Sequence, residues 1–308
     1  MPVNPPRPRG PSLNALRAFE ASARLGGFSA AANELCISPA AVAQHIKTLE
    51  EWAGADLFER QSRGVKLTAL GQGIAFDFHK AFDQLGLATL TLRRRAMPDQ
   101  IRIAALPSIA QLWLPRRLRK IRQAFPDLAI SVTALEVAPN LKREPFDMAI
   151  FYHPLPLGKN LTFLADDFLY PVCSPELAKT LQRPEDLADV TLLDDDQWLD
   201  DWPDWIAQAA PNLAPDISIG RRRAEYSLYA LAIEEAKSGA GVAMARHSLV
   251  ADQMANGDLV APFSHTIACR TALAVTVPNA AQMPVLLSQL IDLLQKDASD
   301  ALEIADKT

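Results

Sequence analysis

The sequence predicts a multidomain α+β protein, in which a small helical domain and one long helix precede a larger α/β domain. Three observations support this fold class. Two short helices separated by a tight break occupy residues 28–52, an apolar stripe with a heptad period runs through residues 71–94, and strand and helix patterns alternate after Pro98. The chain has 308 residues, 49% of them hydrophobic, which is enough for two or three domains with buried cores.

Composition narrows the possible classes of protein. No apolar run approaches the length of a membrane span, so no membrane partner is expected. The three cysteines are isolated, which predicts a reducing compartment and neither a disulfide framework nor a zinc site. No metal or cofactor is expected. Residues 1–11 are rich in proline, lack the apolar stretch of a secretory signal and are predicted to be disordered. We therefore expect a cytoplasmic protein.

Charge is distributed unevenly along the chain. The net charge is −5, yet basic residues outnumber acidic ones up to Arg95 and acidic residues dominate after it. This asymmetry is typical of a nucleic-acid-binding domain joined to a domain with a different kind of partner. The basic excess is small, so the prediction of DNA binding depends on the motifs of residues 12–70.

The first helix is predicted from Leu13 to Leu25. Ser12 is a suitable N-cap, and Gly26-Gly27 ends the helix. Apolar residues at helical spacing predict the buried face, which comprises Leu13, Leu16, Phe19 and Ala23.

A helix-turn-helix follows. A helix from Ser29 to Leu35 is separated by the break Cys36-Ile37-Ser38 from a helix that begins at Pro39, for which Ser38 is a suitable N-cap. The second helix of such a pair can lie in the DNA major groove. The residues expected to point inward from it are Val42, Ile46, Leu49 and either Trp52 or Ala53. The residues left on its outer side are Ala40, Ala41, Gln44, His45, Lys47 and Thr48.

Residues 56–68 predict a hairpin of two short strands joined by a turn at Arg63-Gly64, as in the wing of a winged helix. Gln44 can pair with adenine, Lys47 can reach guanine or phosphate, and basic side chains of the wing would meet phosphates or the minor groove. An ordinary solvated helix face is the alternative. The predicted DNA-binding residues are Ser29, Ser38, Pro39, Ala40, Ala41, Gln44, His45, Lys47, Arg60, Arg63 and Lys66.

One long helix is predicted after Thr68, its expected cap, and extends from Gly71 to Arg94. Its apolar seam has a heptad period and consists of Ile74, Phe78, Ala81, Leu85, Ala88 and Leu92. The seam could pack on its own domain, but the length of the helix favours pairing with a second copy in a homodimer. The basic run 93–95 is interpreted as a solvated boundary.

The remaining residues alternate between strand and helix patterns, which predicts an α/β domain with mainly parallel sheets. The expected strands are 101–106, 129–135, 147–151, 169–173, 191–193, 217–220, 242–245 and 267–277. The expected helices are 107–124, 227–238 and 284–296.

The segment LNALRAFEASARLGGFSAAANELCISPAAVAQHIKTLEEWAGADLFERQSRGVKLTALGQ closely resembles the N-terminal domain of LysR-type transcriptional regulators. It is most similar to the subgroup that contains the glycine-cleavage activator and the β-lactamase regulator. The resemblance implies a linker helix that pairs two subunits, assembly into a homotetramer, and a two-lobed effector domain like that of periplasmic binding proteins. Matching landmarks in that domain are Phe-Asp-Met-Ala-Ile, Pro-Val-Cys-Ser-Pro and Gly-Ala-Gly-Val-Ala.

The predicted domains follow from these segments. Residues 1–11 are the disordered N-terminus, 12–70 the winged helix-turn-helix domain, 71–96 the linker helix and 97–308 the effector-binding domain. By the resemblance, the chain crosses to a second lobe near Asp166 and returns near Thr266. Lobe I is then 97–165 with 266–308, and lobe II is 166–265.

Effector contacts are expected at helix N-termini and strand ends that face the cleft. The effector-binding residues that the resemblance implies are Ser108, Ile109, Glu136, Val137, Phe151, Tyr152, Tyr226 and Ser227. A helix cap alone is the alternative for Ser108. Phe151-Tyr152-His153 replaces the subgroup's Arg-Tyr-Gly, so a charge that would bind a carboxylate is absent, and an arginine of residues 221–223 could supply it. The cluster of Trp198, Trp202 and Trp205 with nearby aspartates is interpreted as a surface helix with a packed aromatic face, not a metal or sugar site.

The predicted function is that of a ligand-responsive regulator that binds pseudo-palindromic operator DNA as an oligomer. Its expected partners are double-stranded DNA, a small-molecule effector, further copies of itself and, as a candidate, RNA polymerase. A solute-binding module and an enzyme on the same scaffold are the alternatives. No nucleophile elbow, phosphate-binding loop or metal triad is present and the five histidines are scattered, so no enzyme is expected. Tyr152 and His153 beside the cleft keep the enzyme alternative open.

Overall fold

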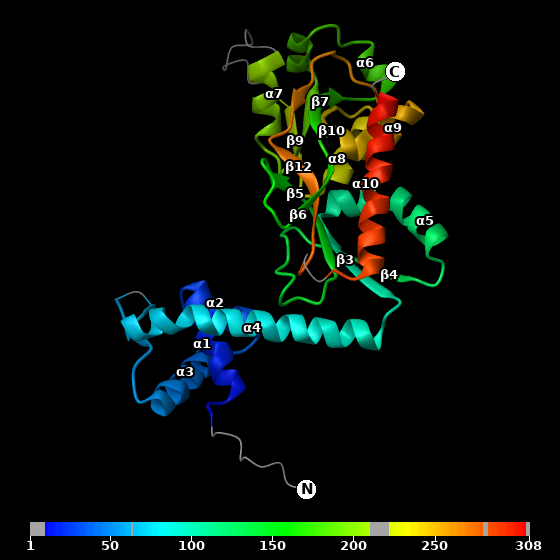
Figure 1. The fold of residues 1–308 in the computed structure, drawn as a ribbon. Helices are drawn as coiled ribbons and strands as arrows, with labels where there is room; N and C mark the ends of the chain where they lie inside the picture. The colour runs from blue at the N-terminus through cyan, green and yellow to red at the C-terminus, as the bar shows by residue number, and fades with distance from the viewer. Residues whose placement is uncertain (1–9, 63, 210–221, 280–282, 306–308) are drawn as a thin grey trace. The chain divides into compact units, whose positions relative to one another are not determined.

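A computed structural model describes residues 10–62, 64–209, 222–279 and 283–305 (Figure 1). The chain divides into two compact units, Met1–Arg93 and Arg94–Thr308. Within the described part of the chain, no helix has both the length and the apolar character needed to cross a membrane.

The first unit contains the predicted helices and hairpin. Its elements are α1 (Leu13–Leu25), α2 (Phe28–Leu35), α3 (Pro39–Ala53), β1 (Phe58–Arg60), β2 (Val65–Leu67) and the greater part of α4 (Ala69–Ala96). The Ser12 hydroxyl accepts a hydrogen bond from the Ala15 amide at 3.2 Å, and the Ser38 hydroxyl accepts one from Ala41 at 3.1 Å. Both predicted N-caps are therefore confirmed.

Phe19 lies at the centre of the core of this unit. Its ring meets Phe58 of the hairpin at 5.8 Å and Phe78 of α4 at 5.4 Å between centroids, both edge to face. Val42, Ile46 and Leu49 of α3 belong to the same core. The hairpin, α3 and the start of α4 are thus fixed to one another.

Two predicted core positions are wrong. Leu13 is 58% exposed, because Ala15, Ala18 and Phe19 form the buried face of α1 and small alanines let its neighbours approach closely. Trp52 is 59% exposed and its alternative Ala53 is exposed too, whereas Leu57, which lies beyond the end of α3, is buried in the core.

The seam of α4 is divided between buried and exposed positions. Ile74 and Phe78 pack against the core of the first unit, which is the alternative considered for the whole seam. Farther along, Leu85 and Leu92 are exposed, at 47% and 70%. The helix begins at Ala69, after Thr68, whose hydroxyl accepts from the Gly71 amide at 3.1 Å.

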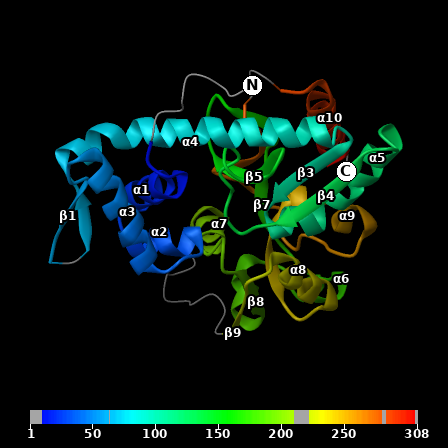
Figure 2. The same cartoon turned by 90° about the horizontal axis from the view of Figure 1, so that it is seen from below.

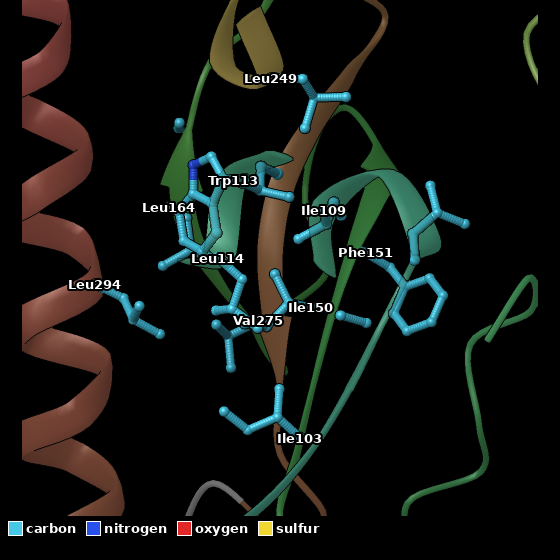
Figure 3. Close-up of a cluster of buried hydrophobic side chains, with 14 of the residues drawn as sticks. Ile103, Ile109, Trp113, Leu114, Ile150, Phe151, Leu164, Leu249, Val275 and Leu294 are labelled. Carbon is cyan, nitrogen blue, oxygen red and sulfur yellow. The ribbon is translucent and has the colours of Figure 1, made fainter. Parts of the chain in front are cut away.

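Lobe I of the second unit contains a five-stranded sheet in the order β4-β3-β5-β12-β6. The strands are β3 (Gln100–Ala105), β4 (Ala129–Ala134), β5 (Met148–Pro154), β6 (Leu161–Ala165) and β12 (Thr271–Thr276). A π-helical turn, Ile109–Trp113, leads into α5 (Leu114–Ala124), and α10 (Val285–Ala305) runs beside the sheet (Figure 1). Figure 3 shows the core between these layers, where Trp113, Leu114 and Leu294 from the helices meet strand residues such as Ile150 and Val275.

Lobe II contains a second five-stranded sheet in the order β11-β7-β10-β8-β9. The strands are β7 (Phe168–Val172), β8 (Thr191–Asp195), β9 (Arg222–Tyr226), β10 (Val242–Arg246) and β11 (Ile267–Ala268). The helices are α6 (Pro175–Ala178), a 3₁₀ turn Pro184–Asp189, α7 (Asp201–Ala209), α8 (Tyr229–Ser238) and α9 (His247–Asn256) (Figure 2). Alternate strand residues pack with α7 on one face and with α8 on the other.

The prediction of mainly parallel sheets is wrong, because both sheets are mixed. β12 is antiparallel to β5 and β6, and β7 is antiparallel to β10 and β11. The chain crosses between lobes at Asp166–Asp167 and returns at Cys269–Arg270. On the return, β11 runs antiparallel to β7 in lobe II and β12 runs antiparallel to β5 and β6 in lobe I. The predicted strand 267–277 is therefore two strands, one in each lobe.

Other differences concern single elements. β6, β9 and α9 were not predicted, and the strand expected at 217–220 lies outside the described residues. Arg94 is not simply solvated: its Nε donates to the Asp147 carboxylate at 2.6 Å. Asp147 also accepts from the Arg102 amide at 2.8 Å, so the end of α4 is attached to the start of β5.

Candidate functional site

The first candidate surface is the outer face of α3. Its buried face, formed by Val42, Ile46 and Leu49, fixes the rotation of the helix about its axis. The opposite face is open: Gln44 and Lys47 are exposed. Of the other predicted DNA-binding residues up to α3, Ser29, Ser38, Pro39 and Ala40 are exposed, and Ala41 and His45 are half-buried.

The hairpin provides a second, adjoining group of basic side chains. Its strands pair antiparallel with Arg60 opposite Val65, and the Gln61 amide donates to the Gly64 carbonyl at 3.1 Å. Gly64 has φ +87°, a left-handed conformation that favours glycine. Arg60 and Lys66 are exposed, whereas Arg63 lies outside the described residues.

Glu50 links α3 to the hairpin, a role that was not predicted. Its carboxylate accepts from the amides of Leu57 and Phe58 at 2.8 and 3.0 Å. A glutamate near the end of a surface helix has no sequence signal for such a contact, because its partners are backbone amides seven and eight residues away.

The second candidate site lies between the two lobes. In lobe I, the parallel register sets Ala105 beside Ala134 and Ile150, so the ends of β3 and β4 and the middle of β5 reach the same level of the sheet. Ser108 and Glu136 lie in the segments that follow β3 and β4, and Tyr152 lies within β5. The structure thus brings together three segments that sequence analysis selected separately, on the side where ligands of α/β folds bind.

The predicted lobe I residues differ in accessibility. Ser108 is 4% exposed, and its hydroxyl neither caps the following helix nor has a hydrogen-bond partner among the described residues. Ile109 and Phe151 belong to the hydrophobic core (Figure 3), so their side chains serve packing. Glu136 and Val137 are exposed.

In lobe II, β8, β9 and β10 are parallel to one another, and their carboxyl ends carry Asp195, Tyr226 and Arg246. Tyr226 is half-buried and Ser227 is exposed. The following helix begins at Tyr229, two residues later than predicted, so Ser227 does not cap it.

Arg246 is a buried cation at the interlobe site, and it was not predicted. It contacts the Asp201 carboxylate through two hydrogen bonds at 2.8 and 2.9 Å, and it donates to the Thr271 hydroxyl of lobe I at 3.2 Å. Its guanidinium lies 4.2 Å from the Trp198 ring centre and 5.1 Å from that of Tyr152. By contrast, Arg223 pairs with Asp194 at 2.6 Å, Arg222 is exposed, and residue 221 lies outside the described residues.

Tyr152 joins the lobes. Its hydroxyl donates to Asp167, at the first crossing, at 2.9 Å and lies 2.8 Å from the hydroxyl of Ser248 in lobe II. Its ring packs edge to face on Trp198 at 5.6 Å. Burial raises the pKa of Tyr152 well above its ordinary value, so the hydroxyl keeps its proton. Neighbouring strand residues point to opposite faces, which separates Tyr152 from His153.

A small hollow of about 10 Å³, room for about one water molecule, lies at the carboxyl end of β8. Its lining includes Asp195, Trp198, Asp201, Trp202 and Tyr229. Burial raises the pKa of Asp195 to about 6, and the charges of Asp196 and Glu136 add to the rise.

The tryptophan cluster is divided between core and site. Trp202 and Trp205 are buried in the lobe II core, as the packing interpretation predicted, whereas Trp198 lies in the interlobe site. No group of three or more histidine, cysteine or acidic side chains suited to a metal ion occurs among the described residues. The signals that could have identified Asp195 and Arg246 are their positions at strand ends.

The architecture defines a class: a winged helix-turn-helix unit followed by a two-lobed α/β unit with a polar and aromatic interlobe site is typical of ligand-responsive DNA-binding regulators. Residues 13–72 match the family "Bacterial regulatory helix-turn-helix protein, lysR family", and residues 95–299 match "LysR substrate binding domain". The chain belongs to the LysR family of transcriptional regulators, and it is a ligand-responsive DNA-binding regulator.

Relatives extend over most of the chain. The regulator DsdC of Escherichia coli K12 is 33% identical over 299 residues, which are 93% of this chain and 94% of DsdC. The glycine cleavage system transcriptional activator of the same organism is 36% identical over 271 residues, which are 86% of each chain. This activator belongs to the subgroup that the sequence resembles. The structure of ArgP from Mycobacterium tuberculosis has a TM-score of 0.53 at 20% identity and covers 92% of this chain and 96% of ArgP, which shows the shared fold.

Proposed function

We propose that the exposed face of α3 reads operator DNA in the major groove while the hairpin contacts the phosphate backbone. The observation that carries this proposal is the division of α3 into a buried apolar face and an exposed face with Gln44 and Lys47. An amide side chain can pair with adenine and an ammonium group with guanine or phosphate. Arg60 and Lys66 add positive charge on the neighbouring hairpin.

Fluorescence anisotropy with a duplex selected from random sequences and a scrambled duplex tests this surface. Gln44→Ala should cost about 1–3 kcal/mol on the selected duplex and little on the scrambled one. Arg60→Ala should weaken both and reduce the salt slope by about 1. Lys179→Ala, an exposed charge in the other unit, is the control. If Gln44→Ala and Arg60→Ala both bind like the wild type, this surface is not the DNA-binding surface.

Two copies pair through the exposed part of the α4 seam, Ala81 to Leu92. The heptad period and the exposed fractions of Leu85 and Leu92, 47% and 70%, support this. A two-fold dimer presents two α3 helices to half-sites one helical turn apart, which predicts a pseudo-palindromic operator. Assembly of two dimers into a homotetramer is the extension that the family implies.

Sedimentation tests the pairing. The double variant Leu85→Glu/Leu92→Glu should be monomeric at concentrations at which the wild type is an oligomer, because buried unpaired carboxylates oppose association. Thr91→Glu adds a charge to an exposed polar position of the same helix and should leave the oligomer intact. An oligomer of unchanged size in the double variant excludes this seam.

The effector binds between the lobes and changes the protein's affinity for DNA through linkage, without a catalytic step. Support comes from the side chains that converge there: Ser108, Glu136 and Tyr152 from lobe I, with Tyr226 and Arg246 from lobe II. RNA polymerase is a candidate partner at the promoter. Because the target is chromosomal DNA, we propose the cytoplasm as the location.

A further inference from the structure

Glu50 lies where α3 ends and the hairpin begins, and it holds both sides of the turn between them. Its backbone carbonyl accepts from the Gly54 amide at 2.8 Å, which closes the last turn of α3. One oxygen of its carboxylate, Oε1, accepts from the amides of both Leu57 and Phe58, at 2.8 and 3.0 Å. Phe58 is the first residue of β1. A single side chain therefore connects α3 to the base of the hairpin.

The same turn is attached to α4 on its other side. The Leu57 carbonyl accepts from the Thr68 amide at 3.0 Å, and the Thr68 hydroxyl donates to the Asp56 carbonyl at 2.9 Å. In the first turn of α4, a β-carbon at Gly71 would collide with the Leu57 carbonyl oxygen, so only glycine permits this approach without a shift of the backbone. Residues 54–58 are thus a joint between α3, the hairpin and α4.

The hairpin depends on this joint for its position. Each of its strands has three residues, and a hairpin of this size has little stability by itself. Arg60 lies two residues beyond Phe58, about 7 Å along the strand, so a change of angle at the base displaces the Arg60 side chain relative to α3. Lys66 lies on the paired strand, opposite Glu59, and moves with it.

The charge of Glu50 makes its role testable. A carboxylate in a unit that binds DNA repels the phosphates, so its replacement by a neutral residue of no other importance strengthens binding. Glu51, the next residue, provides the comparison. It is exposed, and its carboxylate lies 3.7 Å from Lys47 Nζ on the same helix, without a printed contact to the hairpin. Two neighbouring glutamates therefore carry the same charge, and Glu50 holds the hairpin.

We propose that Glu50 is a positioning residue for DNA recognition. Its carboxylate sets the hairpin against α3, so that Gln44 and Arg60 reach the bases and the phosphate backbone of one duplex together. This inference rests on the proposed function, in which α3 and the hairpin form one DNA-binding surface. It goes beyond that function because it assigns a favourable contribution to an acidic residue that does not touch the DNA. The contribution requires the reach of the side chain and not its charge.

Two substitutions separate reach from charge. Glu50→Asp keeps the charge but is shorter by one methylene, so one oxygen no longer reaches both amides. Glu50→Gln keeps the length and an acceptor oxygen but removes the charge. The assay is fluorescence anisotropy of the full chain with the selected and the scrambled duplex, over a series of salt concentrations.

The expected size of the effect follows from the phosphate contacts of the hairpin. One such contact contributes about 0.9 to the salt slope and is worth about tenfold in affinity at about 0.1 M salt. Glu50→Asp should therefore bind both duplexes about 10-fold more weakly, with a salt slope lower by about 1. Glu50→Gln should stay close to the wild type in both quantities.

The same two substitutions at Glu51 are the matched control. Glu51→Asp and Glu51→Gln should both keep the salt slope of the wild type. Circular dichroism and the melting temperature report the folding of each variant. Unfolded molecules lower the active concentration, but they do not change the number of phosphates that a folded molecule contacts. A wild-type slope in Glu50→Asp, or an equal loss of affinity in Glu50→Asp and Glu50→Gln, overturns the proposal.

A double-mutant cycle with Arg60 distinguishes this inference from the proposed function. Because Glu50 acts through the hairpin, Arg60→Ala should weaken binding much less in the Glu50→Asp chain than in the wild type. If the two losses are fully additive, the inference fails alone. If Gln44→Ala and Arg60→Ala have no effect in the wild-type chain, the proposed function fails, and the inference fails with it.

Discussion

Replacing Arg246 by methionine tests how the interlobe site is held together. The Arg246 and Asp201 side chains are only 6% and 13% exposed, so their ion pair is shielded from water. Methionine fills much of the arginine volume, but it leaves the Asp201 carboxylate without its partner. The substitution leaves a buried charge uncompensated and also removes the hydrogen bond to Thr271 and the cation–π contacts with Trp198 and Tyr152.

The expected magnitude follows from this burial. Removing one partner of a buried ion pair costs about 3–5 kcal/mol. For a unit of roughly this size, such a loss lowers the melting temperature on the order of 10 °C. Asp201→Asn combined with Arg246→Met should recover part of the loss, because the unpaired charge is gone.

Thermal unfolding followed by Trp fluorescence is a suitable assay, since Trp198 lies 4.2 Å from the Arg246 guanidinium. Lys179→Met is the control: Lys179 pairs with Glu176, and both side chains are well exposed, at 68% and 82%. An exposed pair contributes at most about 1 kcal/mol. The reasoning is refuted if Arg246→Met destabilises no more than the control, or if the double variant is as unstable as the single one.

Three further predictions concern the two units. Phe19→Ala removes the ring that packs on Phe58 and Phe78, and should cost about 3–5 kcal/mol in urea unfolding followed by circular dichroism; a loss below about 1 kcal/mol would contradict that core. Ser38→Ala should cost about 1 kcal/mol and weaken DNA binding, and an unchanged midpoint would show that the cap is dispensable. Burial raises the pKa of Asp195 to about 6, so the folded protein holds this proton more tightly than the unfolded chain. The free energy of unfolding should therefore fall by about 1–2 kcal/mol, after allowance for solvent screening, as pH rises from about 4 to about 6, and calorimetry should show a smaller fall in Asp195→Asn; equal slopes would exclude this residue as the source.

The DNA-binding unit was predictable to a large extent because its signals are local. Ser12, Ser38 and Gly26 act on the neighbouring turns of helix, and the first and third helices begin where these residues require. The errors are at helix ends. Whether Trp52 or Leu57 enters the core depends on the path of the chain after α3, which periodicity does not contain.

The effector unit was predictable as a series of elements but not as a topology. Strand patterns identified most strands, yet the direction of β12 depends on the second crossing between lobes. Ile109 and Phe151, predicted as effector contacts, are core residues, and Arg246 was not recognised as a site residue. Neighbours in sequence do not reveal which of them face the other lobe.

The amino-acid sequence by itself determined the family, the order of elements and the caps of the first and third helices, because these depend on residues within a few positions of one another. Only the tertiary structure decided which charges meet. Asp201 and Arg246 are 45 residues apart along the chain, yet their atoms lie 2.8 Å apart. Asp195, at the end of the neighbouring strand β8, has no such partner among the described residues, so the packing of β8, β10 and α7 decides which of these carboxylates is paired.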